Sequence, residues 1–140
     1  MSDAVEQAIQ EVIAIAGSLN LPVEVDFPYD PNSDELPVAL VDTGEQEVLE
    51  EDGMPVEGWA TYWRADPSFQ VLIERHDPLE VQTELAEKWT QVREAIKGSR
   101  LLELIRPGTK PELRKAPVVI GDKPGIAGFE VSFVFEIERD

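Results

Sequence analysis

The stretch from Ser68 to Gly98 constrains the fold most, because it sets a strand, a tight turn and a helix in immediate succession. Its first part alternates apolar and polar residues, which is the period of a half-buried strand, and we expect this strand to end at His76. The apolar positions are Phe69, Val71 and Ile73. One face of this strand must therefore be covered by other elements.

A strong helix start follows at once. Asp77 can cap the first turn with its side chain, and Pro78 fits the first helical position, where no N–H is needed. Gly98 is a natural stop. Between them one apolar stripe appears at helical spacing, formed by Val81, Leu85, Trp89, Val92 and Ile96. The stripe predicts a helix that lies on a sheet.

The rest of the chain adds one more helix and several strands. Apolar spacing predicts an amphipathic helix that ends near Gly17, with Val5, Ile9, Val12, Ile13 and Ala16 on one face. Strands are expected at residues 23–27, 37–41, 45–51, 58–64, 116–120 and 129–137, with turns at Thr43-Gly44 and at residues 65–68. Residues 101–105 fit either a short strand or a last helical turn. The last strand has the cleanest alternation and should lie inside the sheet, under a helix.

These elements predict one α+β domain over residues 1–140. We expect a mainly antiparallel sheet of about five to six strands, with two amphipathic helices packed on one face. A chain of this length can bury a single core.

Composition narrows the classes of function. Cysteine is absent, so neither a disulfide nor a Cys-based metal site can form. The 29 acidic and 12 basic residues give a net charge of −17, which disfavours sequence-specific binding of nucleic acid. Residues 1–21 contain no Lys or Arg, unlike a signal peptide, and no apolar run reaches the length of a membrane span. We expect a soluble cytoplasmic protein that binds no membrane.

Catalytic and metal patterns are weak. Asp42-Thr43-Gly44 after an apolar run resembles the aspartic protease motif, and an enzyme of this kind would need two copies to bring two Asp42 carboxylates together. Two later segments resemble the flap and the hydrophobic-glycine segment of that family, but here the flap-like segment comes second, whereas in the family the flap comes first. Asp30, Asn32 and Asp34 have calcium-loop spacing, yet the loop lacks the glycine and the final Glu. His76 is the single histidine. We therefore expect no catalytic residue, no metal and no cofactor.

Three groups of residues suggest contacts with other proteins. Aromatic side chains occur on both faces of one predicted strand, so one face meets either another protein or the protein's own N-terminal loop. A predicted basic loop, residues 106–115, suggests a contact between subunits of an otherwise acidic protein, or is simply solvated. The third group belongs to the predicted hairpin loop from Glu50 to Glu57. The candidate contact residues are Glu50, Glu51, Asp52, Met54, Trp59, Tyr62, Trp63, Arg106, Lys110, Arg114 and Lys115.

The order of elements carries a resemblance. The predicted order is an amphipathic helix, a strand from Leu36-Pro37-Val38 that runs into a turn at Thr43-Gly44-Glu45, two more strands, an Asp-capped helix and a terminal alternating strand. This layout resembles the tail terminator proteins of long-tailed bacteriophages, the family of the lambda U-type minor tail protein. The resemblance implies a non-enzymatic virion protein that assembles in the host cytoplasm into a ring, typically a hexamer. It also implies that the ring caps the tail tube, ends its polymerisation and offers a surface to the head.

The resemblance also implies partners. They are further copies of the chain, the tail tube protein and a head-completion or connector protein, while genomic DNA would pass through the ring without specific binding. Two alternatives remain open. The chain could be another head–tail connector or tail completion protein, or an aspartic-protease-like enzyme that uses Asp42.

Overall fold

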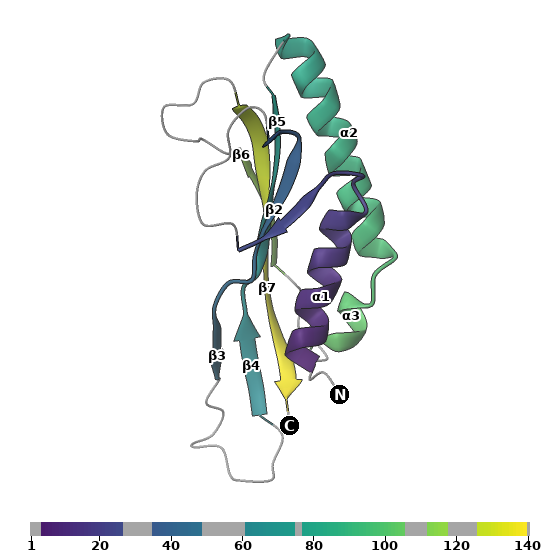
Figure 1. The fold of residues 1–140 in the computed structure, drawn as a ribbon. Helices are drawn as coiled ribbons and strands as arrows, with labels where there is room; N and C mark the ends of the chain where they lie inside the picture. Colours follow the sequence, from purple (N-terminus) through teal and green to yellow (C-terminus); the bar gives the residue numbers. More distant parts are fainter. Residues whose placement is uncertain are drawn as a thin grey trace.

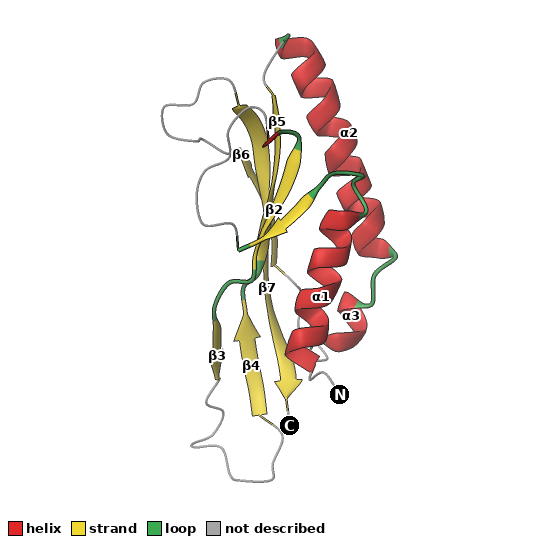
Figure 2. Cartoon of the chain, in the orientation of Figure 1, coloured by secondary structure: helices red, strands yellow, loops and turns green. Residues whose placement is uncertain are grey.

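The computed structural model describes residues 4–26, 35–48, 61–74, 77–105, 112–117 and 126–139. These residues form three helices on one face of a seven-stranded, mostly antiparallel sheet, which confirms the predicted α+β class (Figures 1 and 2). In chain order the elements are α1 (Ala4–Gly17), β1 (Val23–Val25), β2 (Val38–Asp42), β3 (Gln46–Val48), β4 (Thr61–Ala65), β5 (Ser68–Glu74), α2 (Pro78–Lys97), α3 (Leu101–Leu104), β6 (Glu112–Pro117) and β7 (Ile126–Arg139). The helix and strand counts exceed the prediction by the short α3 and by one strand.

The long strand β7 is the centre of the sheet. Its odd-numbered residues point under the helices and are buried, as the alternation predicted; they are Phe129, Val131, Phe133, Phe135 and Ile137. β4 and β5 pair with one side of β7, and β6 pairs with the other. β2 continues the sheet beyond β5, and β1 forms the edge beyond β2 as a parallel neighbour.

The predicted turn at residues 65–68 is wrong. β4 and β5 run along the same side of β7 in one unbroken register, with Ala65 opposite Phe135 and Ser68 opposite Ser132. The carbonyl of Pro67 still accepts a hydrogen bond from the N–H of Phe133, at 3.0 Å. Proline removes one donor from the ladder, and the residue before it favours an extended backbone, so an Asp-Pro pair interrupts the strand without reversing it.

The predicted turn at Thr43-Gly44 is also wrong, because the chain continues in the same direction. β2 pairs with β5 and β3 pairs with β4, so both lie along the same neighbouring strand. Asp42 pairs with Ser68 and Gln46 pairs with Ala65, so an advance of four residues on one strand lies opposite an advance of three on the other. One residue is therefore extra. The break is therefore a bulge, and Gly44 supplies its positive φ of 72°.

The strand predicted at residues 116–120 begins earlier than expected. β6 spans Glu112–Pro117, so the last part of the predicted basic loop is strand, and residues 118–120 lie outside the described residues. All six residues of β6 are exposed. A strand at a sheet edge buries little, so it tolerates a polar sequence that carries no apolar pattern.

Helix α2 confirms the capping prediction. The Asp77 carboxylate accepts hydrogen bonds from the N–H groups of Leu79, at 2.9 Å, and Glu80, at 3.3 Å. The rings of Trp89 and Phe129 lie nearly perpendicular, with an interplanar angle of 86° and their centroids 5.9 Å apart, so the apolar stripe lies on β7 as expected. Residues 101–104 form the short helix α3, which resolves the alternative left open by the sequence.

Candidate interaction surfaces of the sheet

The sheet face opposite the helices is largely polar. Glu130 accepts hydrogen bonds from Gln70, at 3.3 Å, and from Ser132, at 3.0 Å. On the adjoining edge strand the guanidinium group of Arg114 bonds the carboxylate of Glu112. A small apolar cluster of buried and half-buried residues completes this face, formed by Val38, Leu72, Leu36, Leu40 and Ile126. The helices therefore cover one face, and the other presents charged groups to solvent or to a partner.

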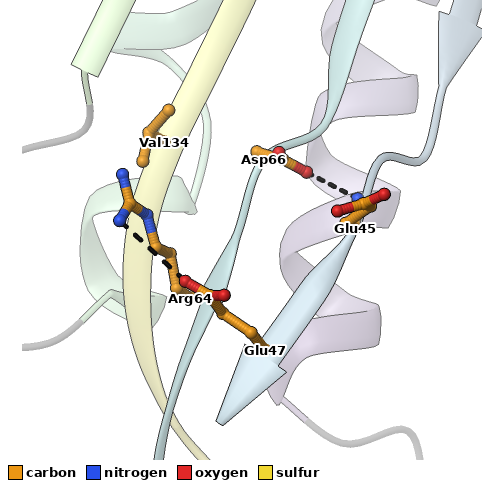
Figure 3. Close-up of a pocket in the computed structure, with 5 residues that line it drawn as sticks. All are labelled: Glu45, Glu47, Arg64, Asp66 and Val134. Carbon is orange, nitrogen blue, oxygen red and sulfur yellow. Dashed lines mark hydrogen bonds and ion pairs between the residues drawn. The ribbon is translucent and has the colours of Figure 1, made fainter. Parts of the chain in front are cut away.

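A shallow depression of about 150 Å³ lies on this polar face, beside the bulge (Figure 3). Glu45, Glu47, Arg64, Asp66 and Val134 line it. The Arg64 guanidinium lies 3.9 Å from the Glu47 carboxylate, and both side chains are more than half exposed. Water screens such a pair, so it contributes little to stability. Its charges remain accessible to a binding partner.

Three aspartates hold the bulge in place. Asp66 accepts a hydrogen bond from the N–H of Glu45 at 2.5 Å, as Figure 3 shows. Asp42 accepts one from the N–H of Gly44 at 2.8 Å. The Asp26 carboxylate accepts hydrogen bonds from both the N–H and the hydroxyl of Thr43. These carboxylates replace the ladder partners that the bulge removes, a structural role that the sequence motif around Asp42 did not indicate.

The residues considered above as metal ligands all lie outside the part of the chain that the structure describes. They are Asp30, Asn32, Asp34 and His76. Among the described residues no group of three or more His, Asp or Glu side chains is arranged to hold a metal ion.

The predicted contact residues divide into two sets. The hairpin residues Glu50, Glu51, Asp52 and Met54 lie outside the described residues, and so do Trp59 of the predicted aromatic strand and Arg106 and Lys110 of the predicted basic loop. Tyr62 and Trp63 are half-buried, and Trp63 packs against the main core under the helices, so only part of its ring can meet a partner. Arg114 and Lys115 are exposed on β6. All eleven remain predictions as contact residues.

Lys115 sits in an arrangement that no sequence spacing indicates. Its amino group lies 5.2 Å from the ring centroid of Trp89 and 5.6 Å from that of Phe129, within the range of a cation–π contact. A groove of about 310 Å³ runs beside it, between α2 and β6, and Leu85, Ala86 and Pro117 form part of its lining. Only the tertiary fold brings this lysine and these aromatic rings together.

No described helix has the length and apolar character needed to span a membrane. No protein-family model matches the sequence, and no curated protein matches it significantly. Among solved structures, the chain is similar to a chain of the virion of a native gene transfer agent particle, with 13% identity and a TM-score of 0.44. The likeness covers 96% of this chain and 91% of that chain. A TM-score below 0.5 does not establish a common fold, so this likeness says nothing of what the protein does.

Proposed function

We propose that this protein is a structural component of a phage-type virion, and specifically a tail terminator. Copies of it would form a ring that caps the tail tube, ends tube polymerisation and offers a surface for head joining. The proposal rests first on the resemblance in the order of elements. The helix before β2, the Asp77-capped helix after β5 and the long alternating strand β7 have the positions that the resemblance implies.

The observation that carries the proposal is the exposed basic edge strand of an acidic protein. All of β6 is exposed, and it carries Arg114 and Lys115 in a chain of net charge −17. Neighbouring copies with such charges attract where β6 meets an acidic surface and repel elsewhere, which fixes one orientation of association. A repeated contact between two different surfaces produces a ring when the rotation closes.

The acidic excess suits the channel of such a ring. Like charge between the protein and the phosphate backbone would let DNA pass without binding. A ring with a basic lumen would contradict this part of the proposal.

The test is assembly. We expect the purified protein to form rings of about six subunits on its own or on the end of the tail tube, since assembly can depend on the partner. Mass measurements over concentration and salt, with electron microscopy, detect the rings. Mixing with polymerising tail tube protein should stop tube growth. Tubes that grow unchanged in the presence of the protein would refute the terminator role.

The two alternatives make different predictions. A head–tail connector or completion protein would bind the connector and leave tube growth unchanged. An enzyme that uses Asp42 would lose its activity in Asp42→Asn but keep its assembly, whereas the terminator would keep its effect on tube growth in this variant. Because Asp42 also holds the bulge, folding of the variant is checked by circular dichroism first.

A further inference from the structure

β1 and β6 are the two outer strands of the run β1-β2-β5-β7-β6, in which each strand pairs with the next. Within the described residues, no strand pairs with the outer side of either. An unpaired edge strand can pair with a strand of another chain, and most proteins cover or protect their edge strands against this. The backbone groups on one edge of a subunit can therefore form hydrogen bonds with the other edge of a neighbouring subunit.

We propose that β1 of one copy adds to β6 of a second copy as an antiparallel strand, so that the sheet continues from subunit to subunit. The inference rests on the proposed ring and names the two surfaces that would build it. The strand that pairs with each free edge comes from a second copy of this chain. Three observations support this partner: the backbone groups that point outward, the directions of the strands and the complementarity of the side chains.

Backbone groups on both strands point outward at matching positions. The N–H of Asp26 and the carbonyl of Pro22 bond to β2, so by alternation the N–H and C=O groups of Val23 and Val25 point away from the sheet. In β7 the N–H of Phe133 bonds toward β5, so the even-numbered residues of β7 bond to β6.

Their partners in β6 are also even-numbered, as Arg114 opposite Ser132 shows. The backbone groups of Leu113 and Lys115 therefore point outward. Each free edge thus offers two consecutive sets of donors and acceptors, at Val23 and Val25 on one side and at Leu113 and Lys115 on the other.

Strand direction fits antiparallel pairing. β1 runs parallel to β2, β2 is antiparallel to β5, and both β5 and β6 are antiparallel to β7. β6 therefore runs opposite to β1. In a ring whose axis lies along the strands, each strand keeps its direction from copy to copy, so β6 meets a neighbour's β1 in the antiparallel sense.

One register then pairs every outward group with a partner. Leu113 lies opposite the neighbour's Val25, Arg114 opposite Glu24, and Lys115 opposite Val23. On the helix side this register joins two exposed apolar side chains, since Val25 is 44% exposed and Leu113 is 38% exposed. On the polar side it sets the Arg114 guanidinium, which has five donors, against the exposed Glu24 carboxylate.

The ladder ends where both strands end. Asp26 leaves the strand with a φ of 52° and turns its carboxylate to Thr43. Pro117 closes β6 at the other end and has no N–H to offer. The contact is therefore short, and we expect single copies at low protein concentration and assembly as the concentration rises.

The decisive experiment is cysteine cross-linking, because the natural chain has no cysteine. Arg114 and Glu24 would form a non-hydrogen-bonded pair, whose close Cα atoms suit a disulfide. Glu24→Cys and Arg114→Cys, mixed and oxidised, should give a covalent dimer that contains one chain of each kind; a mass tag on one variant identifies it. The double variant Glu24→Cys/Arg114→Cys should give a ladder of covalent oligomers.

Other cross-linking patterns overturn the inference. Arg114→Cys that forms a dimer with itself, or that reacts with Glu47→Cys on β3 as readily as with Glu24→Cys, indicates a different contact. No cross-link at any concentration up to the solubility limit is also a refutation. Rings seen by electron microscopy without the mixed cross-link would leave the proposed function standing and remove this interface. Cross-linked copies that grow into open chains would support this interface and contradict the proposed ring.

Charge reversal gives an independent readout. Arg114→Glu should weaken self-association about tenfold, because it replaces an attraction across the contact by a repulsion. Lys97→Glu, at the exposed end of α2, changes the net charge by the same amount and should have a much smaller effect. Adding Glu24→Arg to Arg114→Glu should restore association. Equal weakening by both single variants, with no rescue, would show that only net charge matters.

Discussion

Replacing Gly44 by Ala tests how much the bulge between β2 and β3 contributes to stability. Gly44 has a φ of +72°, a conformation that costs an L-residue about 1–2 kcal/mol. An added methyl group would also come within 2.7 Å of the backbone carbonyl carbon of Asp66, so the neighbouring strand must shift. Overpacking of this kind costs about 1–3 kcal/mol. We therefore expect the free energy of unfolding to fall by about 2–5 kcal/mol.

Urea unfolding, followed by tryptophan fluorescence, measures this loss. With an m-value of about 2 kcal/mol/M, the midpoint should move down by about 1–2.5 M. Gly17→Ala is the matched control, because no atom lies within 4 Å of the added methyl group at the end of α1. Alanine also favours the helix by up to about 1 kcal/mol, so this variant should be unchanged or more stable. A Gly44→Ala protein as stable as the wild type would refute the bulge and the contact with Asp66.

Three further substitutions test other parts of the fold by the same unfolding measurement. Gly128→Ala should lose about 1–3 kcal/mol, because the added methyl group would meet the carbonyl oxygen of Val71 across the strand pair; Gly98→Ala, with its nearest atom at 3.7 Å, should be neutral, and equal effects would contradict the close approach. Asp77→Ala should lose about 1 kcal/mol with the cap of α2, while Asp77→Ser should keep most of it; identical losses would show that the cap does not matter. Phe133→Ala should lose about 3–5 kcal/mol, because the ring is buried and lies 6.1 Å from that of Phe69; a loss below about 1 kcal/mol would mean that the site is not part of the core.

The sequence predicts those elements whose signals are local. Asp77, Pro78 and Gly98 define the ends of α2, and the alternation from Phe129 to Ile137 defines β7, because capping and periodicity depend on neighbours along the chain. The same local logic fails at Asp-Thr-Gly and Asp-Pro. These short motifs favour turns in isolation, but strand pairing before and after each of them keeps the chain running in the same direction through both.

The candidate surfaces were harder to predict, for a related reason. β6 has no apolar alternation, since its position at the edge removes the need for a buried face, and its first four residues, 112–115, were predicted as part of a loop. The contact of Lys115 with Trp89 and Phe129 joins β6, α2 and β7, which only the tertiary fold brings together. Spacing along the chain contains no information about such a contact.

The acidic character of the protein has two components that respond differently to substitution. Asp26, Asp42, Asp66 and Asp77 accept hydrogen bonds from backbone N–H groups, so their charges serve the fold. The Glu47 carboxylate is exposed and contacts only a screened Arg64 at 3.9 Å among the contacts described above. A test of the proposed acidic channel should therefore neutralise glutamates such as Glu47. Neutralising the four aspartates would unfold the bulge or the helix start, and a loss of assembly would then report on stability instead of on charge.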